Sequence, residues 1–321
     1  MGDTIDTASP PKDLDWLHDQ IAQLGATPGW IDRTQPIMGA RESSEFLPAH
    51  WRYADVTNAL SEAGHLVDVA LSERRTLVLR NPRSGNEWAT SNTLVCAYQM
   101  ILPGEFAPSH RHTSHAFRFI IDGKGTYSVV NGVRMPMESG DVVLTPGGYW
   151  HGHGHDGDSP AYWLDGLDVP LTYLLEPLSY EKHPEKVEQI TEVVSTSPFR
   201  FARDEIQRGL DAAPPDPEGL YGSRIHLPTP EMPVMQIQMQ RLEGGSSTRA
   251  WRSTANRIMS VAEGSGTSLI GDKTIAWERG DTFVVPFWHL MQHMATTDAT
   301  LLELSDEPLM RFANYYRKEI V

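Results

Sequence analysis

The sequence predicts an all-β protein in which one β-barrel domain occurs twice, preceded by a helical segment. From Arg75 onward, short runs rich in β-branched and aromatic residues alternate with Gly, Pro, Asn and Asp. The same pattern returns from about residue 225 to 312. The two regions also resemble each other, and a chain of 321 residues is long enough for two domains.

The first 70 residues read as helix and loop. Segments 13–25 and 53–64 carry apolar residues at helical spacing, and each ends at a glycine. We therefore predict an N-terminal helical segment over 1–70, before the first run of strand-like sequence.

Strand-like runs define the remaining boundaries. TLVLR, TLVCAYQMIL, FRFII, TYSVV, DVVLT and AYWLDGL place a first barrel at 71–175. A polar stretch containing PPDPEG predicts a linker with helical parts at 176–224. The second barrel then covers 225–321.

An internal repeat supports two copies of one domain. DGKGTYSVVNG…SGDVVLTP at 122–146 matches EGSGTSLIGD…RGDTFVVP at 263–286. The Gly123–Gly140 and Gly264–Gly280 pairs are 17 and 16 residues apart. A repeat of roughly 140 residues indicates a duplicated domain, because solenoid repeats are only 20–50 residues long.

Composition excludes several classes of protein. The chain has 27 basic and 42 acidic residues, a net charge of −15, and no basic stripe for nucleic acid. No apolar run approaches the ~18 residues of a membrane span. The single cysteine, Cys96, excludes a disulfide framework and a cysteine zinc site. The polar, acidic N-terminus lacks a secretory signal, so we expect a cytosolic protein.

Histidines provide the strongest chemical signal. Six of the thirteen lie between positions 110 and 155. His110 and His112 point to the same face of a strand, and His151 follows a later strand and turn. Three imidazoles converging in a barrel suit Fe, Zn, Cu or Ni, whereas solvated histidines on a polar strand face are the alternative.

Glycines and prolines around these histidines follow a familiar spacing. Gly104 followed by His110-x-His112 resembles the first cupin motif, and Gly140 followed by Pro146 and His151 resembles the second. The resemblance implies two jelly-roll barrels, a bicupin, with metal inside. The glutamate that usually follows the paired histidines is missing from TSHAFRF.

Longer segments narrow the resemblance. HRHTSHAFRFIIDGKGTYSVVNG, GDVVLTPGGYWHGHG and WLDGLDVPL resemble the gentisate 1,2-dioxygenase family, which includes salicylate and 1-hydroxy-2-naphthoate ring-cleaving members. The resemblance implies Fe(II) held by His110, His112 and His151. It also implies a small aromatic carboxylic acid and O2 as substrates, cleavage between the carboxyl- and hydroxyl-bearing carbons, and a homo-oligomer, a tetramer or else a dimer.

Five further residues are candidates for the substrate site. Arg118 lies an even number of residues after His112, so it should face the barrel interior and grip a carboxylate. The family resemblance implies that Gln99 and Asp165 line the pocket and that His153 acts in proton transfer. It also implies that one of two adjacent arginines reaches the substrate, and we favour Arg74 over Arg75.

The third-ligand segment departs from the family pattern. W-H-D-H-G-N is usual there, but Trp150 begins W-H-G-H-G-H in this chain. His115 and His155 have no assigned role. The substituent at ring position 5 therefore stays open between hydroxyl, nitro, halogen and hydrogen.

The second barrel lacks the metal ligands. Aligning the repeats puts Trp251, Ser253 and Met291 where the first barrel has its three histidines, so we expect no metal there. We interpret His289 and His293 as structural or interface residues. Two other functions remain open for the whole chain: another cupin metalloenzyme, or a non-catalytic bicupin that binds a small molecule.

Overall fold

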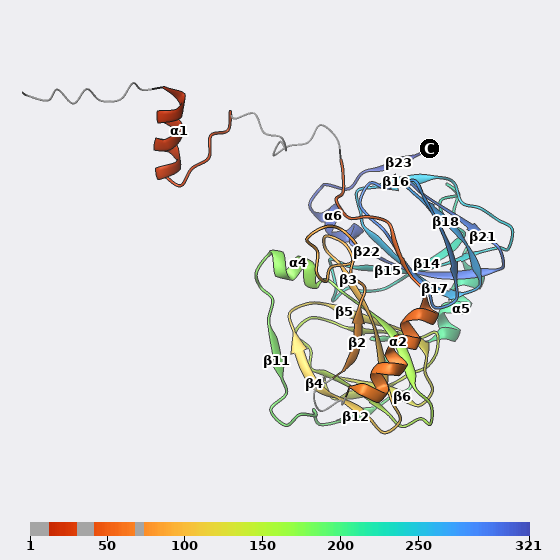
Figure 1. Cartoon of the computed structure of the whole chain (residues 1–321). Helices are drawn as coiled ribbons and strands as arrows, with labels where there is room; N and C mark the ends of the chain where they lie inside the picture. Colours follow the sequence, from red (N-terminus) through yellow and green to blue (C-terminus); the bar gives the residue numbers. More distant parts are fainter. Residues whose placement is uncertain (1–12, 31–41, 68–73) are drawn as a thin grey trace, which may run out of the picture. The chain divides into compact units, whose positions relative to one another are not determined.

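The computed structural model describes residues 13–30, 42–67 and 74–321 (Figure 1). The chain divides into two compact units, Met1–Glu42 and Ser43–Val321. In the first unit, α1 (Leu14–Gln23) begins after Asp13, whose carboxylate accepts a hydrogen bond of 2.8 Å from the Trp16 backbone N–H. This is the helix expected at 13–25. None of the described helices is long and apolar enough to cross a membrane.

Two six-stranded sheets form the first barrel of the second unit. In spatial order, one sheet contains β13 (Arg200–Phe201), β8 (Val142–Thr145), β5 (Ala116–Asp122), β10 (Ala161–Leu167), β3 (Val95–Ile101) and β2 (Arg75–Val78). The other contains β11 (Tyr180–Lys182), β4 (Phe106–His112), β9 (His151–His155), β6 (Thr126–Val130), β7 (Val133–Met137) and β12 (Glu192–Val193).

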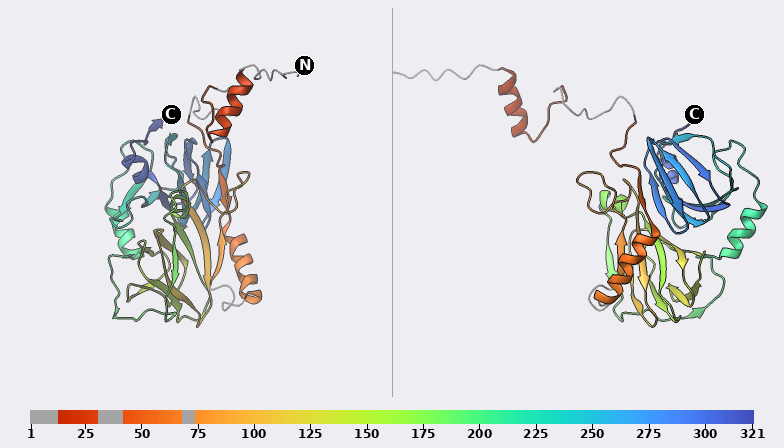
Figure 2. Two further views of the ribbon diagram at one scale, coloured as in Figure 1. Left: turned by 90° about the vertical axis from the view of Figure 1, so that its left-hand side faces the viewer. Right: turned by 45° about the vertical axis from the view of Figure 1, so that its right-hand side comes forward.

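A six-stranded and a five-stranded sheet form the second barrel. The first contains β1 (Ala49–Trp51), β20 (Thr282–Val285), β17 (Arg257–Glu263), β22 (Ala299–Ser305), β15 (Gln236–Leu242) and β14 (Ser223–Leu227). The other contains β19 (Lys273–Glu278), β18 (Ser265–Ile270), β21 (Met291–Ala295), β16 (Trp251–Ser253) and β23 (Lys318–Ile320). Figure 2 shows both barrels from two sides.

Segments expected outside the barrels contribute edge strands. β1 comes before the first barrel in sequence, yet it pairs with β20 of the second. β11, β12 and β13, from the range expected to be a linker, pair with β4, β7 and β8 of the first barrel. An unpaired sheet edge exposes N–H and C=O groups, and these short strands cover such edges.

Four helices lie in the described part of the second unit. They are α2 (Tyr53–Leu66), α4 (Val169–Leu174), α5 (Arg203–Ala212) and α6 (Glu307–Phe312). The helix expected at 53–64 is α2, which buries Val56 and Leu60. α4 and α6 follow β10 and β22, the last long strand of each barrel, so they occupy equivalent places in the repeat.

The hydrophobic core has three parts. The largest cluster joins the two barrels, with Phe117 and Phe119 of β5, Ile258 of β17 and Leu302 of β22 among its members. A second cluster fills the second barrel and a third occupies part of the first. The barrels therefore share one apolar interface.

Strand pairing confirms the bicupin fold and its repeat. His110 pairs with His151 in the first barrel, as Trp251 pairs with Met291 in the second. Gly140 and Gly280 both have φ of +89°, a conformation that favours glycine, in the turn before β8 and before β20. The two barrels thus keep the same turns around different interiors.

Candidate active site

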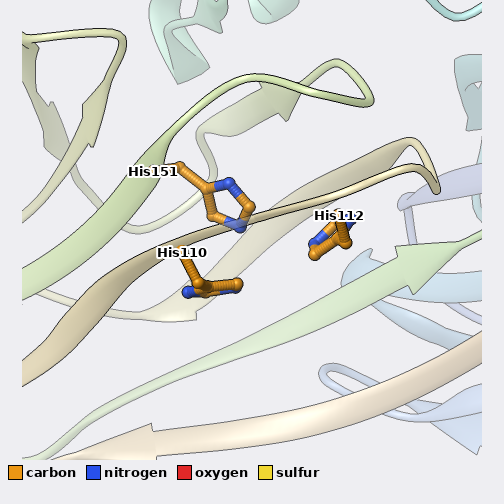
Figure 3. Close-up of side chains that lie close together, drawn as sticks. All are labelled: His110, His112 and His151. Carbon is orange, nitrogen blue, oxygen red and sulfur yellow. The ribbon is translucent and has the colours of Figure 1, made fainter. Parts of the chain in front are cut away.

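Two neighbouring strands bring three histidines together. β4 carries His110 and His112, and β9 carries His151 directly opposite His110. One ring nitrogen from each of the three lies within 4.8 Å of the others (Figure 3). The period-two spacing of β4 explains why both of its histidines reach the barrel interior.

Backbone carbonyls orient all three rings. The Nδ1 atoms lie 3.0 Å from Pro108 O, 2.7 Å from Ser114 O and 3.0 Å from Tyr149 O, for His110, His112 and His151 respectively. A carbonyl can only accept, so each Nδ1 carries the proton and each Nε2 is left with its lone pair. Nε2 of His151 is buried with no hydrogen-bond partner in the described part of the chain.

Burial keeps the imidazoles neutral. It lowers the pKa of His112 to about 4, with Arg118 and Arg74 adding repulsion, and it holds the pKa of His151 well below its usual value. Metal ions bind neutral imidazole. Three converging lone pairs, one of them buried and unpartnered, therefore fit a divalent metal such as Fe(II).

A cavity of about 460 Å³ adjoins the triad. It is lined by one ligand, His112, and by four of the predicted substrate residues, Arg74, Gln99, Arg118 and Asp165. Val78, Val95, Ala97, Leu167 and Val169 supply most of the remaining wall, together with Thr76 and Trp88. The cavity is large enough for a substituted single-ring aromatic acid.

Of the two adjacent arginines, Arg74 lies at this cavity. Its Nη1 is 3.2 Å from Nε2 of His110. The Arg75 guanidinium instead donates to Glu105 at 2.7 Å and to the Val67 carbonyl at 3.0 Å. Arg75 is therefore held by structural contacts away from the triad.

Arg118 and Asp165 contact each other. Nε of Arg118 lies 3.2 Å from Oδ1 of Asp165, and Nη1 donates to Oγ1 of Thr145 at 2.6 Å. The Trp163 indole also donates to Asp165, at 3.1 Å. Burial raises the pKa of Asp165 and lowers that of Arg118 to about 10. The carboxylate thus fixes the direction of the guanidinium on the cavity wall.

His153 lies beside the triad but outside it. Its ring centre is 6.1 Å from that of His151 and 5.6 Å from that of Trp163. The side chain is buried, and neither ring nitrogen has a hydrogen-bond partner among the described residues. A buried, unpaired imidazole next to a metal site can exchange a proton with a bound molecule.

The two histidines without a predicted role have structural contacts. Nδ1 of His115 accepts a hydrogen bond of 3.0 Å from the Gly147 backbone N–H. Nε2 of His155 lies 2.6 Å from the Ser159 carbonyl. His115 therefore braces the turn that leads to His151, and His155 holds the turn after β9.

Two aromatic residues at the site were not anticipated from the sequence. Tyr180 of β11 stacks on His110, with ring centres 5.2 Å apart, and Trp88 lines the cavity. Tyr180 falls within the polar range expected to be a linker, and Trp88 lies in the irregular segment between β2 and β3. No periodic pattern marks either position.

The second barrel has a different interior. Trp251, Ser253 and Met291 are buried there. Arg257 makes ion pairs with Glu303 at 3.1 Å and with Glu307 at 2.7 Å. Glu307 is the first residue of α6 as Val169 is the first residue of α4, so one partner of these ion pairs stands where the first barrel has an apolar residue of the cavity wall.

A buried three-histidine cluster inside one of two jelly-roll barrels defines the class: a bicupin able to bind one metal ion. The cupin domain model matches residues 97–167. The chain is 32% identical to gentisate 1,2 dioxygenase 1 of Aquipseudomonas alcaligenes over 96% of both chains. It is also 32% identical to 5-aminosalicylate 1,2-dioxygenase of Comamonas sp, over 96% of this chain and 90% of that one.

A solved structure agrees with these relatives. A mutant salicylate 1,2-dioxygenase from Pseudoaminobacter salicylatoxidans, in complex with gentisate, superposes with a TM-score of 0.89 at 28% identity, covering 99% of this chain and 98% of that one. The chain belongs to the gentisate 1,2-dioxygenase family, and it is an aromatic ring-cleaving dioxygenase.

Proposed function

We propose that this protein is an Fe(II)-dependent dioxygenase that cleaves a salicylate-type acid between its carboxyl- and hydroxyl-bearing carbons and places both atoms of O2 in the product. The observation that supports this most directly is a cluster of three histidines that can hold a metal ion, next to a cavity lined by His112 and two guanidinium groups. Iron bound by His110, His112 and His151 would supply electron transfer between the aromatic ring and O2.

The charges of the cavity favour a doubly anionic aromatic acid. Three neutral imidazoles leave a divalent ion its full charge, and Arg74 and Arg118 add two positive charges against the one carboxylate of Asp165. A carboxylate next to a phenolate balances this excess. Such a positive site inside a chain of net charge −15 attracts a small anion locally.

The side chains of the cavity suggest a division of roles. Arg118, held by Asp165 and Thr145, binds the substrate carboxylate. Arg74 adds charge on the side of His110, and Gln99 offers both a donor and an acceptor at the cavity wall. His153 lies beside the triad and is neutral and unpaired, so a ring nitrogen can accept a hydrogen bond from the phenol and guide its proton away.

The names of two relatives suggest which substituent the substrate carries at ring position 5. One relative is named for gentisate, which carries a 5-hydroxyl, and another for 5-aminosalicylate. We therefore propose gentisate or another 5-substituted salicylate as the substrate.

Oxygen uptake after anaerobic loading with Fe(II) tests this function. We expect about one iron per chain and consumption of one O2 per molecule of at least one salicylate in a panel with 5-hydroxy, 5-amino, 5-nitro and 5-chloro members. His112→Ala should lose both iron and activity while keeping its β-sheet circular dichroism. Tight zinc binding with no iron-dependent oxygen uptake would favour another cupin chemistry, and binding of the acids without uptake would favour a binding protein.

A further inference from the structure

The registers of three strands order the residues of the cavity from its deep end to its outer end. Gln99 of β3 pairs with Trp163 of β10 at the deep end. One step outward, Asp165 lies between Ala97 and Arg118. A further step outward, Val95 pairs with Leu167. The polar groups are therefore deep, and the outer part of the cavity is apolar.

Trp88 closes the outer end. It lies between β2 and β3, half-buried, and its indole meets the Tyr173 ring of α4 edge-on, with ring centres 5.7 Å apart. Trp88 also lines a second cavity of about 680 Å³, and of the described residues it alone lines both. Val169 lines the first cavity and its neighbour Pro170 the second, so the Trp88 ring and the start of α4 form the partition.

The second cavity suits an aromatic group. Phe46, Pro170, Tyr173 and Leu174 contribute apolar surface to it. The Arg83 guanidinium lies 5.2 Å from the centre of the Phe46 ring and is paired with Glu45. A ring that passed Trp88 would find the aromatic surface of Phe46 and Tyr173 on which to stack.

Substrate geometry relates this partition to specificity. In a salicylate, C5 is para to the hydroxyl-bearing carbon, so a 5-substituent points directly away from the group that faces the metal. With the carboxylate at Arg118 and the hydroxyl toward the triad, that substituent points along the apolar part of the cavity, toward Val95, Leu167 and then Trp88.

We propose that Trp88 is a specificity-determining residue that limits how far a substrate can extend beyond C5. Small 5-substituents end before the indole. A 5-aryl group must displace the indole and enter the second cavity. This inference rests on the proposed function for the orientation of the acid.

Anaerobic calorimetry of the Fe(II)-loaded full chain tests this proposal, with salicylate and 5-phenylsalicylate as ligands. Trp88→Ala should raise the affinity for 5-phenylsalicylate relative to salicylate at least tenfold, and Trp88→Phe should give a smaller gain in the same direction. Trp288→Ala removes a half-buried tryptophan from the second barrel and should leave the ratio unchanged.

The role of Trp88 would be overturned if the ratio of the affinities for 5-phenylsalicylate and salicylate changed by less than twofold in both Trp88 variants. It would also be overturned if Trp288→Ala raised this ratio equally. If Trp88→Ala does not fold, the Phe variant still gives the ratio. If the wild type binds both acids but consumes no O2 with either, the ring-cleavage proposal fails while the affinity ratio still tests Trp88. If it binds neither acid, both proposals fail.

Discussion

A single buried ion pair determines how the cavity presents its main cation. Asp165 lies 3.2 Å from Nε of Arg118 and Thr145 accepts a hydrogen bond from Nη1, so both neighbours favour one orientation of the guanidinium before any acid binds. A preorganised fork loses little conformational freedom when it grips a carboxylate. Arg118 thus combines charge with a fixed direction.

Removing that cation should weaken catalysis without removing the metal. Leaving a carboxylate without its buried charged partner costs on the order of 2–5 kcal/mol, which is roughly thirty-fold to several-thousand-fold. We expect Arg118→Ala to lose that much in kcat/KM and to keep its iron, and Arg118→Lys to recover part of the loss. Arg134→Ala serves as the control, because it removes an arginine of β7 whose ion pair, with Asp156, lies away from the cavity. Unchanged kcat/KM in Arg118→Ala would contradict the assignment.

His153 should separate proton handling from metal binding. Its ring lies beside the triad but not within it. We expect His153→Ala to retain about one iron and to lose mainly kcat, and His151→Ala to lose the iron itself. Iron analysis and steady-state kinetics on both variants measure this. Loss of iron from His153→Ala as complete as from His151→Ala would make His153 a ligand.

At the scale of elements, the loop between β4 and β5 sets the position of His112. The Ser114 carbonyl accepts from Nδ1 of His112, and the Ser114 hydroxyl lies 2.9 Å from Thr172 of α4. The His115 backbone N–H donates to Asp168 at 2.8 Å. The start of α4 therefore holds the loop that aims one candidate ligand.

Titration of Asp168 should make the free energy of unfolding depend on pH. Burial raises the pKa of this carboxyl to about 6, against the hydrogen bond from His115. Because the folded pKa is above the ordinary value near 4, the group stabilises the fold most at low pH, and this contribution is lost as pH rises through 6. Relative to Asp168→Asn, the metal-free wild type should lose at most about 3 kcal/mol of unfolding free energy between pH 4 and 7.

Urea unfolding of both proteins at several pH values measures that difference. Asp298 is an exposed carboxylate that accepts from the Gly244 backbone N–H, so Asp298→Asn is the matched control. If the difference in unfolding free energy between wild type and Asp168→Asn stays constant from pH 4 to 7, the pKa of Asp168 is not raised in the folded protein.

Sequence reasoning reached those parts of the site that depend on local spacing. Alternation along β4 predicted that His110 and His112 share a face, and the repeat predicted the second barrel. Spacing alone could not show that Asp165 lies opposite Arg118, because the pairing of β10 with β5 joins segments distant in sequence. Tyr180 and Trp88 could not be predicted as site residues for the same reason: tertiary contacts, not a periodic pattern, bring them to the site.

At the scale of the whole molecule, one segment carries an exposed apolar surface. Tyr173, Leu174 and Leu175 are each about two-thirds exposed, and Leu178 is 41% exposed. Contiguous apolar surface of this kind often marks contacts between proteins. It supports the expected homo-oligomer.

We predict a tetramer, or else a dimer, in solution at micromolar concentration. Leu175→Glu should weaken association, because burying an unpaired carboxylate at an interface is unfavourable. Sedimentation velocity measures both, with Leu24→Glu, at the exposed leucine that follows α1, as the control. A monomeric wild type would contradict the prediction.

Because β1 pairs with β20 of the second barrel, the chain cannot be divided simply between the two barrels. Residues 49–51 complete a sheet of the second barrel, and α2, immediately after them, packs on the first. A cut in the PPDPEG segment would therefore separate the second barrel from its own edge strand. We expect the two pieces to be poorly soluble when made separately and to recover the native fold when made together, so that a cell could not recombine these barrels as independent modules.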